Sequence, residues 1–324
     1  MRLRNLALAA AAAMALAAGR PARAADLCDR ACLQGFVDRY IEAMTAHDPT
    51  RLPLGSGVRF TENGQELMLG DGLWGTASGR GRYSLYVSDP EAGQAGFLGT
   101  VMENGEPVLL GLRLKISDQT ITQVETIVAR SQNSGSTLPS AGRSLEAKGQ
   151  PRPQFLRTVP EGERMSREDL VRVADSYFTG LAANTGRNTA PFAPTCNRWE
   201  NGSQTTNNPS LRANQGVNIL AMGCEQQQKS GFFPFVTSIR NRRYEVVDRE
   251  RGLVLAFGFF EHQGRIKELH LTTGETVPSP VRAPMTFEIG ELFQIDRGRI
   301  DQVEAVLNTV PYGMISAVWD KRGQ

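Results

Sequence analysis

Charged residues recur in a short pattern that could bind an acidic ligand or tune a carboxylate. The pattern reads arginine, aromatic residue, glutamate, Asn-Gly and then glutamine, and it occurs at residues 58–65 and 197–204. Its charged members are Arg59 and Glu62 in the first copy, and Arg198 and Glu200 in the second. An arginine beside a glutamate can hold an anionic substrate through its planar fork of donors. The alternative, which a repeated motif favours, is a structural ion pair beside a hairpin turn.

A glutamate in the last strand-like segment of each half is a candidate general base. Glu125 lies two residues after Gln123, and Glu304 lies two residues after Gln302. Side chains two apart on a strand point to the same face. If that face lines a cavity, Glu125 and Glu304 project into it, and a dry pocket would move the pKa of either carboxyl toward neutrality. If it does not, both face solvent.

His262 is the third kind of candidate, because it follows an aromatic run at a predicted strand end and could serve as a general base. The alternative is a loop histidine beyond the strand. Several aromatic residues could line a pocket for an aromatic ligand, although aromatic residues in strands more often belong to the core. These pocket candidates are Trp74, Tyr83, Tyr86, Trp199 and Tyr244.

No sequence motif indicates a cofactor. The chain has no G-x-S-x-G elbow, no P-loop, no H-E-x-x-H pair and no dinucleotide fingerprint. Its four cysteines are not in paired C-x-x-C form, and only three histidines could join them as metal ligands. We therefore expect neither a cofactor nor a metal site.

Three matched segments in the same order indicate that one module occurs twice. The arginine pattern repeats at an offset of 139 residues, a tyrosine-containing strand (from Tyr83 and from Tyr244) at 161, and an Ile-x-Gln-Val-Glu segment at 179. The second copy therefore carries insertions of 22 and 18 residues between matched segments. Insertions of this kind lie in loops, and long loops are often functional.

The chain divides into four parts. Residues 1–25 have a basic start, a short apolar run and an A-x-A site, which is the pattern of a secretory signal peptide. Residues 26–130 form the first module, residues 131–163 a Ser/Gly/Pro-rich linker, and residues 164–324 the second module. The apolar segment at 311–319 is expected to pack across a module mouth or the interface.

The charge balance and the cysteines limit the expected cellular location and the expected partners. The chain has 36 basic and 34 acidic residues, and loss of the four arginines in residues 1–25 leaves 32 basic ones. Basic and acidic residues alternate at 240–251, so we expect no nucleic-acid partner, and after signal cleavage no membrane. The expected location is periplasmic or secreted, where four cysteines form disulfides. Pairing within each module gives Cys28–Cys32 and Cys196–Cys224.

Each module is predicted to begin with a helix, because apolar residues recur at spacings of three and four near residues 27–44 and 170–181. Alternating segments and an Asn-Gly hairpin signal then predict antiparallel strands. One helix followed by a long curved sheet resembles the SnoaL-like, or nuclear-transport-factor-2-like, fold. Four segments are also similar to a little-characterised secreted family of bacteria and fungi with tandem SnoaL-like units: AHDP (46–49), RFTENGQ (59–65), GDGLW (70–74) and PYGM (311–314).

The resemblance implies an α+β fold of two cone-shaped units, each with its N-terminal helix packed on a curved antiparallel sheet. The superfamily includes ketosteroid isomerase and scytalone dehydratase together with many pockets that catalyse nothing, so the fold implies a cavity without a reaction. The first hypothesis is an exported, cofactor-independent lyase, dehydratase or isomerase that moves a proton on a small apolar or aromatic molecule. The alternative is a non-catalytic periplasmic binding or scaffold protein. The expected partner is a small molecule, and homodimerisation stays open.

Overall fold

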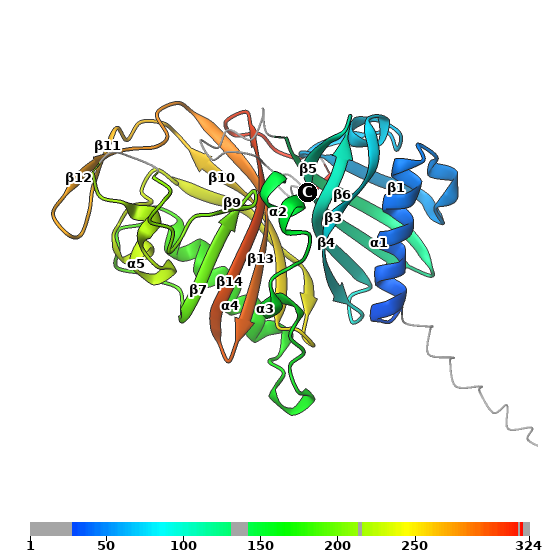
Figure 1. Ribbon diagram of the computed structural model, residues 1–324, viewed down its shortest axis with the longest axis horizontal. Coiled ribbons are helices and arrows are strands. Elements are labelled where there is room, and N and C mark those ends of the chain that lie inside the picture. Colours follow the sequence, from blue (N-terminus) through cyan, green and yellow to red (C-terminus); the bar gives the residue numbers. More distant parts are fainter. Residues whose placement is uncertain (1–27, 131–141, 213–215, 317, 320–324) are drawn as a thin grey trace, which may run out of the picture.

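The computed structural model describes residues 28–130, 142–212, 216–316 and 318–319, and it shows a mixed α+β protein. Two six-stranded sheets and one small two-stranded sheet account for its strands in this part of the chain. Figure 1 shows the two large sheets facing each other in the middle of the molecule, with the first helix on the outer side of the first sheet. The expected α+β class is thus confirmed, and the predicted signal segment lies outside the described residues.

The first module begins with helix α1 (Arg30–Thr45), which Asp29 caps by accepting a hydrogen bond from the backbone N–H of Cys32. One stripe of α1 is buried against the first sheet, which explains its helical apolar spacing. The 3₁₀ turn η1 (Pro49–Arg51) precedes the first strand, and a second 3₁₀ turn, η2 (Gly72–Gly75), lies between the second and third strands. The strands of this module are β1 (Leu54–Glu62), β2 (Gln65–Leu67), β3 (Ala77–Asp89), β4 (Gln94–Glu103), β5 (Glu106–Ser117) and β6 (Thr120–Ala129).

The second module begins with helix α4 (Arg167–Leu181), whose cap Ser166 accepts from the backbone N–H of Asp169. Its sheet contains β7 (Phe192–Glu200), β8 (Ser203–Gln204), β9 (Ser238–Asp248), β10 (Leu253–His262), β13 (Met285–Asp296) and β14 (Arg299–Val310). Two inserted segments have no counterpart in the first module. The insert between β8 and β9 holds η4 (Ile219–Ala221) and α5 (Cys224–Lys229), and the insert between β10 and β13 holds the hairpin β11 (Glu268–His270) and β12 (Thr276–Pro278).

Both sheets have the same strand order. The first runs β2-β1-β6-β5-β4-β3 and the second runs β8-β7-β14-β13-β10-β9. In each sheet the first long strand pairs in parallel with the last one, β1 with β6 and β7 with β14. The turn asparagine of each module then holds the last strand in place. Asn63 exchanges two hydrogen bonds with the backbone of Val128, and Asn201 exchanges two with the backbone of Leu307.

The register corrects the predicted match between the two arginines. Phe60 pairs with Val124, and Arg198 pairs with Val303, the residue 179 positions after Val124. Phe60 is therefore the counterpart of Arg198, and the match of Arg59 with Arg198 is wrong by one position. The second copy has one residue fewer between its arginine and the Asn-Gly turn. A shift of one residue on a strand moves a side chain to the opposite face.

The match between the tyrosines is also corrected. The hydroxyl of Tyr86 donates to Asp38 on α1 at 2.5 Å, and the hydroxyl of Tyr244 donates to Asp175 on α4 at 2.5 Å. Tyr86 rather than Tyr83 is therefore the counterpart of Tyr244. Irregular pairing in both strands, with register shifts after Arg80 and at Ala256, hides this offset in the sequence.

The two modules pack through the sheet faces that turn away from their helices. A core between them joins residues of both sheets, among them Leu85, Leu98, Leu255, Phe257, Leu292 and Val306. Two reciprocal ion pairs flank this core. Arg30 at the start of α1 contacts Asp248 of the second module at 2.6 Å, and Arg167 at the start of α4 contacts Asp89 of the first. The first arginine of each leading helix thus pairs with an aspartate of the other module.

The linker contributes regular structure where the sequence predicted none. It forms α2 (Arg143–Lys148), α3 (Pro153–Leu156) and the 3₁₀ turn η3 (Glu161–Glu163). Leu145 and Phe155 are fully buried in the core between the sheets. Short helices of this kind carry too few residues for a periodic pattern, so tertiary packing rather than sequence period fixes them.

The C-terminal segment crosses the interface between the modules, as expected. The indole N–H of Trp319 donates to the hydroxyl of Thr61 in the first module at 2.8 Å. Its ring lies over the guanidinium of Arg113, 4.7 Å away. Both predicted disulfides, Cys28–Cys32 and Cys196–Cys224, are confirmed. Within the described ranges, no helix has the length and apolar character to cross a membrane.

Candidate functional site

The two predicted bases of the last strands lie between the sheets rather than in a cavity. Glu125 accepts from Arg113 at 2.9 Å and from Arg243 of the other module at 2.5 Å. Glu304 accepts from the hydroxyl of Tyr83 at 2.7 Å and from Arg152 of the linker at 2.6 Å. Neither predicted environment, cavity or solvent, applies, because the face in question packs against the partner sheet.

The neighbours of these two carboxyls explain their pKa values. Burial acts to raise the pKa of Glu125, but the charges of Arg243 and Arg113 outweigh it and hold that pKa below its ordinary value. Burial raises the pKa of Glu304, and Arg152 only partly opposes the shift. Both groups have their bonds made by protein partners, so they are structural elements of the interface.

The predicted aromatic ligand-binding residues are dispersed. Tyr83 donates a hydrogen bond to Glu304 at the interface. Tyr86 and Tyr244 each donate a hydrogen bond to the first helix of their own module. Trp199 lies under the guanidinium of Arg152, whose central carbon is 3.3 Å from the ring centroid. Trp74 is buried in the first module. None of these five residues lines the cavity described below.

In the first module, buried side chains connect the helix to the sheet. Trp74 donates from its indole N–H to the hydroxyl of Tyr40 on α1 at 2.8 Å, and both side chains are almost fully buried. Glu62 accepts from the backbone N–H of Leu73 at 2.7 Å. Burial raises the pKa of Glu62, partly offset by that bond and by Arg130. The first module therefore uses its motif glutamate to hold the turn that carries the tryptophan.

Arg59, the other predicted ligand-binding residue of this motif, points to solvent. Its guanidinium forms a two-pronged pair with Glu66, at 2.8 and 3.0 Å, and both side chains are about half exposed. An exposed pair of this kind contributes little to stability and does not contact Glu62.

The second module contains a cavity of about 220 Å³ between α4 and its sheet. Both inserted segments contribute to its wall, through residues such as Leu220 and Val281. Aromatic side chains make up much of the lining, namely Tyr177, Phe232, Phe233, Phe235, Phe260 and Phe287. A small pocket with mostly apolar walls and few polar groups is the usual form of a small-molecule site.

Four polar side chains meet at one end of the cavity: Tyr177 from α4, Arg198 and Glu200 from β7, and Glu291 from β13. Arg198 donates to the Tyr177 hydroxyl at 3.3 Å and to the hydroxyl of Thr205 at 3.0 Å. Its Nε lies 3.1 Å from a carboxylate oxygen of Glu200. Of the two predicted charged pairs, only this second one faces a cavity. Its arginine is buried, and its glutamate keeps 31% of the side chain exposed.

Glu291 is the most perturbed polar group of this end. It is 3% exposed, and one of its carboxyl oxygens has no hydrogen-bond partner. Burial raises its pKa to about 8, with a further rise from the charge of Glu200, while Arg198 and a hydrogen bond from Tyr177 act in the opposite direction. Glu291 therefore holds its proton at neutral pH and can release it slightly above.

Sheet register places the two carboxyl groups on opposite sides of a small residue. Ala305 of β14 pairs with Glu200 of β7 on one side and with Glu291 of β13 on the other. Two strand spacings separate the Cα atoms of the glutamates by about 10 Å. Because the alanine side chain between them is short, a molecule can lie over it with a carboxyl group at each flank.

The equivalent row of the first module has neither a short side chain in its middle nor a second carboxyl group. Thr126 occupies the position of Ala305, and it pairs with Glu62 and with Leu112, the counterpart of Glu291. The first module thus keeps one glutamate of the pair and replaces the other with leucine. The chemistry that the pair could perform is confined to the second module.

His262 lines the cavity, but it lies far from Glu291. The partner of Glu291 on β10 is Ala256, so His262 is six residues along that strand, or about 20 Å. The imidazole is 1% exposed, stacks on Phe235 and meets the edge of Phe287, and its Nδ1 has no partner. Burial lowers the pKa of His262 to about 4, so the ring is neutral at physiological pH.

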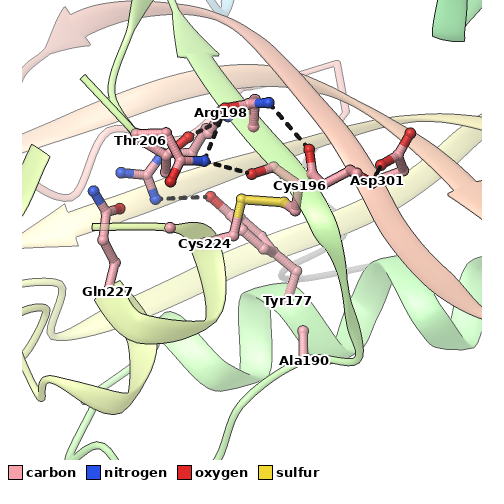
Figure 2. The surroundings of a disulfide bond; sticks show 12 residues. Tyr177, Ala190, Cys196, Arg198, Thr206, Cys224, Gln227 and Asp301 are labelled. Carbon is pink, nitrogen blue, oxygen red and sulfur yellow. Dashed lines mark hydrogen bonds between the residues drawn. A yellow bond between two sulfur atoms is a disulfide. The ribbon is translucent and has the colours of Figure 1, made fainter. Parts of the chain in front are cut away.

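Figure 2 shows how the second disulfide supports the polar end. Cys196 precedes Arg198 on β7, and its bond to Cys224 fixes the start of α5 beside Tyr177. The amide of Gln227 on α5 then donates to two backbone carbonyls, those of Thr205 and Ile219, at 2.6 and 2.8 Å. The insert that walls the cavity is thereby attached to the strand that carries its charged residues.

Sequence reasoning missed Glu291 because the surrounding segment, FEIGELFQI, predicts an apolar strand. The available signal was the pair Glu288 and Glu291 within that strand, since carboxylates are rarely buried without a reason. Within the described residues no cluster of three potential metal ligands occurs. The expectation that the protein works without a metal stays a prediction.

Comparison with known proteins gives a family without an assigned activity. A family described as a domain of unknown function (DUF8021) matches residues 163–307, which cover most of the second module and all residues that line its cavity. No curated protein matches. One similar solved structure is the crystal structure of a de novo designed protein with a curved β-sheet. It is 15% identical, with 44% of this chain and 88% of that chain covered and a TM-score of 0.22.

Proposed function

We propose that the second module is a cofactor-independent enzyme of the lyase, dehydratase or isomerase type, acting on a small and mostly apolar molecule. The observation that carries this proposal is Glu291, a buried carboxyl group with an unpartnered oxygen at the polar end of an apolar cavity. A group whose pKa is close to the working pH is well suited to transfer a proton in either direction.

The row of Glu200, Ala305 and Glu291 supplies an acid and a base on two sides of a bound molecule. In a dehydration, Glu200 takes the proton from a carbon next to a carbonyl group, and a carbon–carbon double bond forms. The hydroxyl on the neighbouring carbon leaves with the proton of Glu291 as water. Glu200, which is partly exposed, then passes its proton to solvent, and Glu291 regains one.

Arg198 would stabilise the charge that develops on the carbonyl oxygen. It is a buried donor held in place by Thr205, Glu200 and the hydroxyl of Tyr177. Donors that are already oriented in a dry site stabilise an oxyanion without reorganisation. An isomerisation uses the same groups, with the proton returned to a different carbon.

The first module has the role of a scaffold in this proposal. Its interior is occupied by Trp74 and Tyr40, and it contributes Glu125 and Tyr83 to the interface. We further propose that each helix and sheet form a SnoaL-like cone, and that the protein is exported to the periplasm or the medium. The shared strand order supports the first point, and two disulfides support the second.

The experiment that tests the proposal is proton exchange in D₂O. A panel of aryl methyl ketones and β-hydroxy ketones is incubated with the protein, and deuterium incorporation next to the carbonyl is followed by NMR. We expect the wild-type protein to accelerate exchange for at least one compound and Glu200→Gln to abolish the acceleration. Glu291→Gln should keep the exchange but lose the elimination of water from the β-hydroxy ketones. Glu288→Gln is the matched control, because Glu288 is a buried glutamate of the same strand on its opposite face.

Exchange at the buffer rate for every compound, or elimination of water at the wild-type rate in Glu291→Gln, would refute the catalytic proposal. Binding of a ketone without exchange would instead support a non-catalytic small-molecule-binding protein. Loss of water elimination in both Glu291→Gln and Glu288→Gln would show that the strand rather than the carboxyl is needed.

A further inference from the structure

The cavity of the second module has polar groups at both of its ends. Glu291 and Arg198 line one end, and His262 lines the other, with phenylalanine side chains between them. Ala256 and His262 are an even number of residues apart on β10, so both face the same side of the sheet. The single cavity therefore extends along the strand from the carboxyl group to the imidazole.

Backbone groups of Phe260 and Met285 lie beside the imidazole of His262, but its Nδ1 makes no direct hydrogen bond. Nδ1 is buried and unpartnered, although a buried polar atom without a partner is costly. The rings of Phe235 and Phe287 fix the plane of the imidazole from two directions. A ring that is held rigidly with one nitrogen unsatisfied is arranged to receive a hydrogen bond from outside the chain.

The separation of the two ends excludes a joint action on one atom. Six residues of strand correspond to about 20 Å, which the side chains from both ends only partly span. An imidazole at this distance from Glu291 cannot exchange a proton with the bond that Glu291 serves. His262, which the sequence suggested as a general base, is thus placed to recognise the remote end of a ligand.

We propose that the cavity takes an elongated, mostly apolar molecule with a carbonyl group at one end and a hydroxyl at the other, and that His262 is the residue that selects the hydroxyl. The inference rests on the proposed function for the carbonyl end. A hydroxyl fits the histidine end because it both donates and accepts, and so it pairs with either nitrogen of a neutral imidazole. The phenylalanine walls match a planar, conjugated spacer.

The test measures binding with matched ligands. Isothermal titration compares 4-(4-hydroxyphenyl)but-3-en-2-one with the same ketone lacking the hydroxyl, in the wild-type protein and in His262→Phe. We expect the hydroxyl to tighten binding of the wild type by about tenfold or more, because a buried nitrogen is otherwise left unpaired. In His262→Phe, the two ketones should bind equally.

The shorter pair 4-hydroxyacetophenone and acetophenone is the length control, and we expect its hydroxyl to change the affinity of the wild type by less than about twofold. His270→Phe, which alters an exposed histidine on β11, is the control variant and should keep the preference of the wild type. If His262→Phe does not fold, the comparison of the two long ketones in the wild type still decides.

Equal binding of the long ketones by the wild type, binding of neither, or a preference that survives in His262→Phe would overturn the inference. The outcome is separable from that of the catalytic proposal. A hydroxyl preference without proton exchange sustains the two-ended ligand and refutes the enzyme. Proton exchange without a hydroxyl preference does the reverse.

Discussion

Arg198 stands in the second module where the first module has Phe60. The side chain on this rung of the sheet points between helix and sheet in both modules, and it is buried in both. With phenylalanine there, the space closes into an ordinary core around Trp74. With arginine there, the space keeps polar groups that need partners, and the cavity remains. The two copies thus share one scaffold and differ in whether its interior is apolar.

The pH dependence of stability should reveal the buried Glu291. Its pKa is raised from the ordinary value of 4.5 to about 8 in the folded protein. The folded state therefore binds a proton that the unfolded state has lost, so this group's contribution to stability is complete below pH 4.5 and declines as the pH rises toward 8. We expect the wild type to lose a few kcal/mol relative to Glu291→Gln across that interval.

Chemical denaturation at several pH values from 5 to 9 measures this difference directly. Glu66→Gln is the control, because Glu66 is exposed and its pKa is lowered by Arg59, so its contribution changes only in acid. If the unfolding free energies of the wild type and Glu291→Gln change in parallel with pH, Glu291 ionises normally. The proposal that it acts as an acid would then be wrong.

Reduction of the Cys196–Cys224 disulfide should destabilise the second module. The bond closes a loop of 28 residues, and a loop of this size contributes roughly 3–4 kcal/mol in the chain-entropy estimate. We expect Cys196→Ala/Cys224→Ala to melt at a lower temperature than the wild type and to bind aryl ketones more weakly, since the bond holds the insert that walls the cavity.

The other disulfide provides the matched comparison. Cys28–Cys32 closes a loop of only four residues, so Cys28→Ala/Cys32→Ala should cost less, roughly 2 kcal/mol, and leave ketone binding unchanged. Melting that does not respond to reductant, measured by calorimetry with and without dithiothreitol, would contradict a stabilising role for either bond.

The sequence predicted the duplication and the disulfides because both depend on local patterns. Repeated asparagines, apolar residues at helical spacing and alternation along strands are all visible in the sequence. Asn63 and Asn201 do occupy equivalent turns. The correspondence of arginines failed because one residue is missing before the second turn. Register is a property of pairing between strands, and no single strand displays it.

The site was less predictable because it depends on long-range placement. Glu125 and Glu304 were found by alternation, but alternation does not tell which face meets the helix and which meets the other sheet. Glu291 was overlooked because a glutamate within an apolar strand resembles a surface position. Only the packing of α4 and the two inserts against β13 shows that this glutamate lies at the end of a cavity.

The ion pair across the module interface should contribute more to the free energy of unfolding than an exposed pair of the same chemistry. Arg243 donates to both oxygens of Glu125, which is fully buried. Arg243→Met leaves that carboxylate with a single arginine, so we expect a loss of roughly 3–5 kcal/mol in the free energy of unfolding. Arg59→Met breaks the exposed pair with Glu66 and should cost less than about 1 kcal/mol.

Urea denaturation of the two methionine variants tests this ranking under one set of conditions. Equal losses in both variants would mean that the buried carboxylate finds another partner or solvent when Arg243 is removed. In that case the interface would be less dry than its burial indicates.

Trp74→Ala should convert the closed first module into an open one. The side chain is 1% exposed and bonded to Tyr40, and removal of a buried tryptophan costs about 3–5 kcal/mol. The cavity left behind contains the Tyr40 hydroxyl, so it should bind indole, whose N–H can restore the lost hydrogen bond. We expect indole to raise the melting temperature of Trp74→Ala and to leave that of the wild type unchanged.

Phe97→Ala opens a buried site in the same core without a free hydroxyl beside it, and its melting temperature should respond less to indole. If indole stabilises neither variant, the core of the first module collapses around the deletion, and its tryptophan is not the reason that the module lacks a cavity.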